Sequence, residues 1–327
     1  MLIAVDAAGG DHYPRNPVEG AIQAIEEDAS VQILLVGPEQ LIANELEGRE
    51  YDKKRIHIHH APEIIGMEES PASAVRNKQL SSIVQGIGAH KAGKCSAFVS
   101  AGNTGALLAA STFILGKLPG VIRPTIAAYY PTIKGFRLLV DAGANLEIKP
   151  EIAAQFAKMG SVFLSEILGI DTPKYGLLNV GEEEEKGTDT LKEIFKHLST
   201  DPNFIGNVEG RDILFAKADV YLCDGLVGNI SLKLGESFPD AIKLLIMKAV
   251  KEGKVTEEEA YTAQKVLGLA LSPFNYELVG GIPFLGVNGV SIVGHGGSSA
   301  LAIKNMIMSA KKCVEANLNE KIIASLN

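Results

Sequence analysis

The sequence has no tryptophan, only three cysteines, and few aromatic residues, which make up 6% of its 327 residues. The spacing of Cys95, Cys223 and Cys313 fits neither a metal site nor a redox motif. Such thiols are typical of reduced cores in cytosolic proteins. No apolar run reaches the roughly 18 residues that a membrane-spanning helix needs, and the first residues favour a strand over a signal peptide. We therefore expect a cytoplasmic protein.

Positive charge is also scarce, because 31 Lys and Arg residues face 39 Asp and Glu residues, for a formal net charge of −8. Nucleic-acid-binding proteins usually carry a basic face, so we expect no nucleic acid partner. The nicotinamide motif G-x-G-x-x-G is absent. The few arginines are scattered, which weighs against a decarboxylating dehydrogenase that holds a dicarboxylate.

Short apolar runs alternate with amphipathic stretches along the chain, which indicates a doubly wound α/β fold with a mostly parallel sheet. The expected strands are 2–5, 31–36, 97–100, 126–130, 137–140, 176–180, 204–208, 220–223 and 289–293. The expected helices are 18–27, 71–92, 106–115, 151–168, 189–198 and 298–317. We predict a single α/β domain over residues 1–327, from which a helical pair at 232–271 protrudes.

Histidines gather at 56–60, where alternation places His57 and His59 on one face of a strand. A solvated edge strand is the favoured interpretation, and a metal site is the alternative. We expect no metal and no cofactor.

Glycine is abundant, with 34 residues, and it clusters where the predicted strands end. Glycine lets the backbone approach a ligand closely, and helix N-termini after such turns bind anions. If the turns share one edge of the sheet, they predict a broad anion-binding cleft. The residues that we expect to bind phosphate or substrate are Asp6, Gly9, Gly10, Asp11, Ser100, Gly102, Asn103, Thr104, Gly105, Asp141, Asn145, Gly181, Asn207, Glu209, Gly210, Asp224, Gly225, Gly228, Asn288 and Gly289.

Three further residues are candidates for catalysis: Lys186, Asn229 and His295. Lys186 follows the acidic run 182–185 and could reach a phosphate, although such a run also suits a solvated loop before a helix. His295 lies between glycines just before a helix, where it either contacts substrate or makes a structural hydrogen bond.

These residue types suit one reaction in particular, the attack of inorganic phosphate on a thioester. Phosphate is already a nucleophile near neutral pH, and a thiol with a pKa of about 8.5 leaves without strong acid assistance. The protein then supplies position and hydrogen-bond donors. The sequence has many such donors and no evident catalytic triad.

The glycine-rich motifs closely resemble those of the bacterial phosphate acyltransferase family (PlsX) of phospholipid synthesis. The resembling stretches include D-A-A-G-G-D, S-A-G-N-T-G-A, D-A-G-A-N, N-V-G-E-E-E-E-K-G, F-I-G-N-V-E-G-R-D, D-G-L-V-G-N and H-G-G-S-S-A. They run in order from Asp6 to Ala300 and cover nearly the whole chain. Two positions depart from the family pattern, Ala8 in place of methionine and the additional Gly297.

The resemblance implies a fold similar to isocitrate and isopropylmalate dehydrogenases and to phosphotransacetylase. It implies a homodimer that transfers a fatty acyl group from acyl carrier protein to inorganic phosphate. The acyl phosphate would then serve an acyl-phosphate-dependent glycerol-3-phosphate acyltransferase, and the enzyme would associate peripherally with the membrane. Two alternatives remain, a short-chain phosphotransacetylase that acts on acyl coenzyme A and a non-catalytic scaffold for carrier protein.

One segment of the predicted helical pair has apolar residues at helical spacing beside several lysines. Ile242, Leu245 and Ile246 belong to the apolar stripe, and Lys248 lies next to it. A basic amphipathic helix on an acidic protein suggests contact with an anionic membrane. The alternative is that the stripe packs on another helix or on a second subunit.

Overall fold

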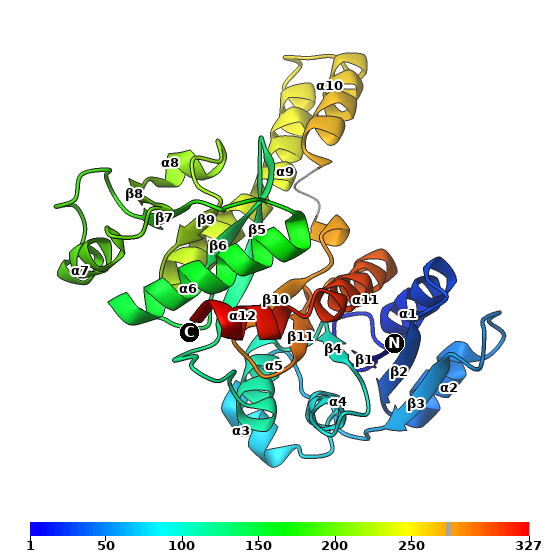
Figure 1. The fold of residues 1–327 in the computed structure, drawn as a ribbon. Coiled ribbons are helices and arrows are strands. Elements are labelled where there is room, and N and C mark those ends of the chain that lie inside the picture. Colours follow the sequence, from blue (N-terminus) through cyan, green and yellow to red (C-terminus); the bar gives the residue numbers. More distant parts are fainter. Residues whose placement is uncertain (273–275, 327) are drawn as a thin grey trace.

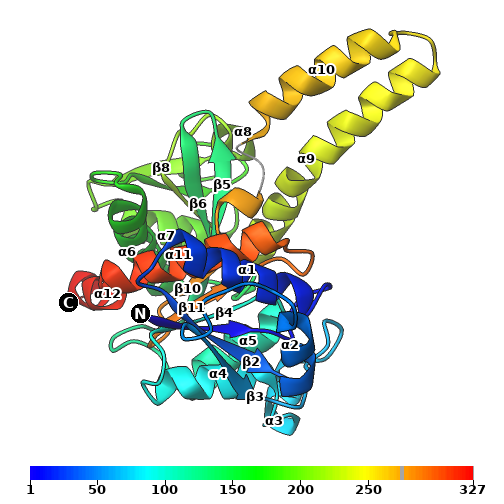
Figure 2. The same ribbon diagram turned by 90° about the vertical axis from the view of Figure 1, so that its right-hand side faces the viewer.

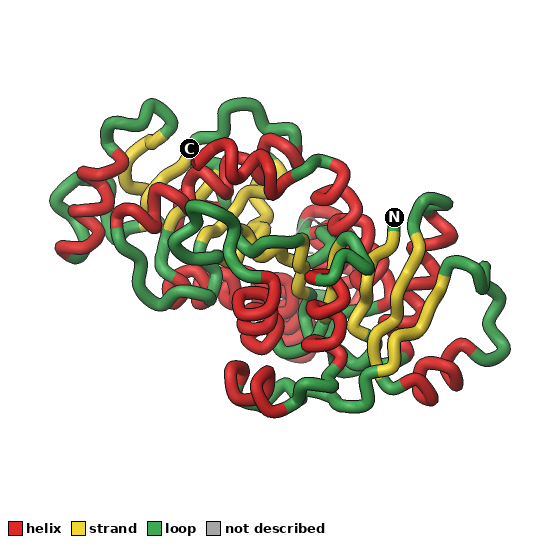
Figure 3. The backbone as a smooth tube through the Cα atoms, turned by 60° about the horizontal axis from the view of Figure 1, so that its bottom comes forward, coloured by secondary structure: helices red, strands yellow, loops and turns green. Residues whose placement is uncertain are grey.

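The computed structural model describes residues 1–272 and 276–326, and its strands form an 11-stranded sheet in the order β3-β2-β1-β4-β11-β10-β5-β6-β9-β7-β8. Figure 3 shows the strands running through the middle of the molecule between the helices. The strands are β1 (Leu2–Asp6), β2 (Gln32–Gly37), β3 (Ile56–His60), β4 (Ala97–Ser100), β5 (Thr125–Thr132), β6 (Gly135–Val140), β7 (Tyr175–Leu178), β8 (Phe204–Val208), β9 (Val220–Leu222), β10 (Ile282–Leu285) and β11 (Val290–Val293).

The sheet is mostly parallel, as predicted, but it reverses direction near its centre. The pairs β11–β10, β10–β5 and β5–β6 are antiparallel, whereas the other neighbouring pairs are parallel. Strands β1 to β5 and β11 therefore run one way, and β6 to β10 run the other way. The expectation that all glycine-rich turns share one edge is wrong, because the carboxyl ends of the two groups point to opposite edges.

Helices cover both faces of the sheet (Figure 1). The core clusters place α1, α2, α6, α7, α11 and α12 on one face and α3, α4, α5, α8 and α9 on the other. The helices are α1 (Arg15–Glu27), α2 (Glu39–Leu46), α3 (Pro71–Asn77), α4 (Ser82–Lys91), α5 (Thr104–Ala110), α6 (Pro150–Phe163), α7 (Asp189–Leu198), α8 (Gly210–Ile213), α9 (Gly225–Lys251), α10 (Glu257–Ala270), α11 (Ala300–Glu315) and α12 (Leu318–Leu326). Short helical turns are η1 (Ser111–Leu115), η2 (Leu164–Leu168) and η4 (Tyr276–Leu278).

Most predicted elements are present, with a few differences at local breaks. The helix expected at 71–92 is two helices, because Ser81 begins a new one by accepting a hydrogen bond from the Val84 N–H. Strand β10 was not predicted, and its Ile-Pro-Phe-Leu sequence carries no alternation. Strand β3, with its histidines, lies at the end of the strand order, which confirms the edge-strand interpretation.

Helices α9 and α10 pack together and extend away from the rest of the molecule (Figures 1 and 2). Helix α9 begins at Gly225, before the predicted start at Leu232, because the side chain of Asp224 accepts a hydrogen bond from the Val227 N–H. The first part of α9 therefore lies against the sheet, and only the later part protrudes.

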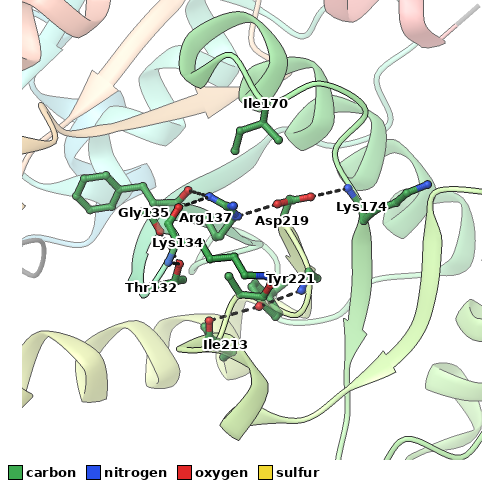
Figure 4. A network of polar contacts seen from close by, with 12 residues as sticks. Thr132, Lys134, Gly135, Arg137, Ile170, Lys174, Ile213, Asp219 and Tyr221 are labelled. Atoms are coloured by element: carbon green, nitrogen blue, oxygen red, sulfur yellow. Dashed lines mark hydrogen bonds and ion pairs between the residues drawn. The ribbon is translucent and has the colours of Figure 1, made fainter.

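The hairpin formed by β5 and β6 is fastened to the neighbouring strands by polar contacts (Figure 4). The Arg137 Nε atom lies 2.7 Å from Asp219 Oδ1, and Asp219 Oδ2 accepts a hydrogen bond from the Lys174 N–H at 2.9 Å. Both charged side chains of the Arg137–Asp219 pair are largely buried. This ion pair holds β6 against the strands beside it and fixes the position of β5, which lines the cavity described next.

Candidate functional site

A cavity of about 430 Å³ opens between β5, the start of α5, the start of α9 and the loop before α11. Four residues predicted from the sequence border it: Thr104, Gly105, Asn229 and His295. They come from segments that are far apart in the chain. The cavity is therefore built only when both halves of the sheet are assembled.

Asp6 ties the turns after β1 and β4 together. Its Oδ2 atom accepts a hydrogen bond from Ser100 Oγ at 2.6 Å, and Ser100 Oγ accepts one from the Gly102 N–H. A Cβ atom at Gly9 would lie 2.7 Å from Asp6 Oδ2, so the turn requires glycine there. Burial raises the pKa of Asp6, although hydrogen bonds from neighbouring donors oppose the shift. Asp6 and Ser100 thus hold the loops and do not line the cavity.

The turn after β1 also meets the loop before α11. The Asp11 N–H donates to the Gly296 carbonyl at 2.8 Å, and a Cβ atom at Gly10 would approach that oxygen to 2.9 Å. These contacts place the segment around His295 beside the end of β4.

Asn103 positions the start of α5. Its Oδ1 atom accepts a hydrogen bond from the Ala106 N–H, and its Nδ2 atom lies within 3.1 Å of three carbonyl oxygens, those of Gly66, Met67 and Glu69. The amide is thus fully used in holding the helix start. Thr104 and Gly105, which follow it, reach the cavity instead.

Asp141 holds neighbouring backbone segments together on the opposite half of the sheet, as Asp6 does on the first half. Its carboxylate accepts hydrogen bonds from the Thr125 hydroxyl, from the Ile126 N–H and from Asn145. Burial raises the pKa of Asp141, and these donors oppose the shift. A Cβ atom at Gly228 would lie 1.8 Å from the Asp141 carbonyl oxygen, so only glycine lets α9 begin so close.

This close approach brings Asn229 to the cavity. Asn229 lies on α9 just after Gly228, and its side chain is within 4 Å of where a Cβ atom of Gly143 would be. Gly143, with a φ of 132°, also lines the cavity. The side chain of Asn229 is exposed. An amide donor and glycine backbone therefore meet at this wall.

His295 follows β11 and lies on the opposite wall. Its Nδ1 atom accepts a hydrogen bond from the Gly297 N–H at 3.3 Å. An acceptor nitrogen carries no hydrogen, so the neutral ring has its hydrogen on Nε2. Ser298, which the sequence did not single out, is buried beside it and also lines the cavity.

The third group of predicted residues lies outside this cavity, at the ends of β7 and β8. Lys186 is half exposed and lies 4.0 Å from the Glu183 carboxylate. The Asn207 amide donates to the Glu183 carbonyl at 2.8 Å. Glu209 caps α8 and pairs with Arg211 at 2.6 Å. Gly181 and Gly210 belong to the same turns.

Asn288 and Gly289 also lie elsewhere, at the amino end of β11. The Asn288 N–H donates to the Gly116 carbonyl, and a Cβ atom at Gly289 would lie 2.4 Å from His90 Nε2. Their glycine-rich pattern reflects close packing against His90.

Several cavity residues escaped the sequence reasoning because they carry no motif. They lie on ordinary strand and helix faces, and nothing in their local sequence separates them from core residues. They are Leu108, Ile126, Tyr129, Tyr130, Phe136, Leu232, Lys233, Ile282, Ala302 and Met306.

The protruding helices divide the predicted membrane stripe between two faces. Ile242 and Ile246 border a groove between α9 and α10, whereas Leu245 is 65% exposed and Lys248 is also exposed. The position of Ile242 and Ile246 fits the alternative that part of the stripe packs on another helix, and membrane contact stays a prediction. Leu244 and Met247 are exposed next to Leu245.

None of the helices in the described ranges is long and apolar enough to cross a membrane. In the same part of the chain, no group of three or more His, Cys, Asp or Glu residues is placed to hold a metal ion. His59 Nε2 instead lies 3.3 Å from Gln85 Oε1, and His60 Nδ1 accepts a hydrogen bond from the Glu39 N–H.

Solved structures with a similar fold include phosphotransacylases. A phosphotransacetylase from Staphylococcus aureus matches with a TM-score of 0.60 at 16% identity, covering 95% of this chain and 94% of that one. A branched-chain phosphotransacylase from Enterococcus faecalis matches with a TM-score of 0.57 at 14% identity, covering 95% and 99%. At these identities the likeness shows the fold alone.

Proteins related by sequence are more similar to this chain than these structures are. Residues 1–321 match a family described as fatty acid synthesis protein. A phosphate acyltransferase from Chlorobaculum parvum is 48% identical over 100% of this chain and 99% of its own length. One from Salinibacter ruber is 45% identical over 97% and 95%. The chain therefore belongs to the family of fatty acid synthesis proteins that includes these phosphate acyltransferases, and it is an acyltransferase.

Proposed function

We propose that the protein transfers a fatty acyl group from acyl carrier protein to inorganic phosphate, which yields an acyl phosphate for glycerol-3-phosphate acylation. The observation that carries this proposal is that two helix starts and a side-chain amide border one cavity. Thr104 and Gly105 begin α5 and Ser298 precedes α11, whereas Asn229, in the second turn of α9, contributes its side chain. Main-chain N–H groups and helix dipoles at such starts favour an anion of the size of phosphate.

The reaction depends on how the phosphate and the thioester are positioned more than on a strong general acid or base. A phosphate oxygen attacks the thioester carbon, the new C–O bond forms, and the C–S bond breaks as the thiolate leaves. Negative charge develops on the carbonyl oxygen during this step. Asn229 and the Nε2 hydrogen of His295 are two of the side-chain donors in the cavity lining that could stabilise that charge.

The partners follow from the same proposal. The names of the relatives support phosphate as acceptor, and the family resemblance supports acyl carrier protein, a homodimer and the glycerol-3-phosphate acyltransferase that uses the product. Ile230 and Leu234 are about 60% exposed on α9, which gives a second copy an apolar surface to cover.

We also propose that this cytoplasmic enzyme contacts anionic membranes through the protruding pair. Leu244, Leu245 and Met247 are exposed there, next to Lys248. Apolar residues beside lysines suit the surface of an anionic bilayer. Release of a greasy, reactive acyl phosphate at a bilayer also spares it hydrolysis in water.

The decisive experiment measures release of carrier-protein thiol from a palmitoyl carrier-protein thioester with and without orthophosphate. We expect release only with phosphate, together with one acyl phosphate per thiol. Equal release without phosphate would contradict the proposal. Faster turnover of acetyl coenzyme A than of the long-chain thioester would instead indicate a short-chain phosphotransacetylase, and binding of carrier protein without turnover would indicate a scaffold.

A further inference from the structure

The cavity extends past one edge of β5, along which part of the strand is not paired with β10. Strand β10 pairs with β5 only at Thr125 and Ile126, although β5 continues to Thr132 with β6 on its other side. Beyond Ile126, the edge of β5 therefore faces the cavity, which Tyr129, Tyr130 and Pro131 all line. Alternate residues of a strand point to opposite faces. The cavity consequently reaches both faces of the sheet.

The two sides of this passage differ in chemistry. On the face that carries α5 and α9, Thr104, Asn229, Lys233 and Glu236 contribute polar and charged groups beside apolar residues such as Leu108 and Leu232. On the face that carries α6 and α11, the lining includes Phe136 and Met306, with no charged side chain among the described residues of that wall. A ligand with a polar head and an apolar tail matches this division.

The apolar side has a rigid aromatic wall. The ring centroid of Tyr129 lies 5.8 Å from that of Phe136 and 5.7 Å from that of Phe163 on α6. Burial raises the pKa of the Tyr129 hydroxyl, as expected for a ring packed among apolar groups. Opposite this wall, Ala302 on α11 is buried and contributes only a methyl group.

We propose that the acyl chain passes the open edge of β5 and ends in this apolar compartment, where Phe136 and Ala302 determine which chain length fits. The assignment rests on the proposed function, because it takes the reacting thioester to lie on the polar side. Phe136 forms the end of the compartment, and the small side chain of Ala302 keeps it open. Neither residue takes part in the chemical step.

The test compares kcat/KM for carrier-protein thioesters with acyl chains from short to long. Each methylene group that loses its buried position costs about fourfold in kcat/KM. Ala302→Leu should therefore lower kcat/KM for the longest chain at least about tenfold relative to a short one. Phe136→Ala should shift the preference the other way, toward longer chains. Phe136→Leu repeats the test if the alanine variant does not fold.

The matched control is Phe113→Ala, because Phe113 is 73% exposed on η1 and does not line the cavity. It should leave the chain-length profile unchanged. Folded Ala302 and Phe136 variants with the wild-type profile would overturn the assignment while leaving the proposed function intact. A wild-type protein that releases no thiol in response to phosphate at any chain length would overturn both.

Discussion

The backbone N–H of Gly297 donates a hydrogen bond to Nδ1 of His295, with 3.3 Å between the two nitrogens. Because Nδ1 accepts this bond, the neutral ring carries its hydrogen on Nε2, the nitrogen that can donate to an anionic oxygen.

If His295 stabilises charge in the reaction, its replacement should lower kcat. We expect His295→Ala to reduce kcat about a hundredfold, and Gly297→Pro, which removes the N–H, to reduce it roughly fivefold. Gly297→Ala is the control, because its Cβ atom would lie an ordinary 3.7 Å from Nδ1. Thioester turnover measures all three, and a proline variant as active as the alanine variant would contradict the role of this bond.

Asn229 and Lys186 were both candidates for catalysis, but only Asn229 lines the cavity. We expect Asn229→Ala to lower kcat about a hundredfold because a donor to the developing charge is lost. Lys186→Ala should change kcat less than about twofold, since its ion pair with Glu183 is exposed. A large loss with Lys186→Ala would show that the turns after β7 and β8 belong to the site.

The Arg137–Asp219 pair should contribute to stability. Arg137→Ala leaves the largely buried carboxylate of Asp219 without its cation, and we expect the free energy of unfolding to fall by about 1.5–3 kcal/mol. Lys192→Ala removes an exposed pair with Asp189 and should cost less than about 1 kcal/mol. Urea unfolding compares the two variants, and similar losses would disprove a special contribution of the Arg137–Asp219 pair.

His90 should make stability depend on pH. Burial lowers the pKa of His90 below 6.5, and its Nε2 atom is buried without a partner among the described residues. The unfolded chain then binds a proton more readily than the folded one, so stability is lost as pH falls below about 6.5. His90→Gln should flatten this decline in urea unfolding between about pH 7.5 and pH 5.5. The exposed His57→Gln variant should keep the wild-type slope, and an unchanged slope in His90→Gln would contradict the prediction.

The exposed side of α9 should determine membrane contact. Leu245→Glu replaces a 65% exposed leucine with a negative charge, and we expect binding to anionic vesicles to fall at least about tenfold while turnover in solution persists. Leu41→Glu, at a 42% exposed leucine on α2, is the control. Sedimentation with vesicles measures both, and equal binding of the two variants would argue against the protruding pair as the contact.

Local chemistry was enough to predict most elements from the sequence. Apolar runs marked the strands, but the helix starts capped by Ser81 and Asp224 were missed, although each cap accepts from an N–H only three residues away. Gly9 and Gly228, which we expected to bind substrate, lie where a Cβ atom would clash with Asp6 and Asp141.

The order and direction of the strands depended on contacts between distant segments, so only the tertiary structure decided them. Lys186 follows β7, which runs parallel to β9 and lies beyond it in the sheet, and Asn288 lies at the amino end of β11, so neither reaches the cavity although their turns look like that of Asn229. The reversal at β10 and at the β5–β6 hairpin opened the edge of β5 and brought Phe136, Ala302 and Met306 to the same cavity. By itself the sequence determined where most strands and helices lie, because the apolar pattern that marks them repeats within a few residues. Which turns meet in one site depends on how the strands pair across the sheet, and no single turn encodes that pairing.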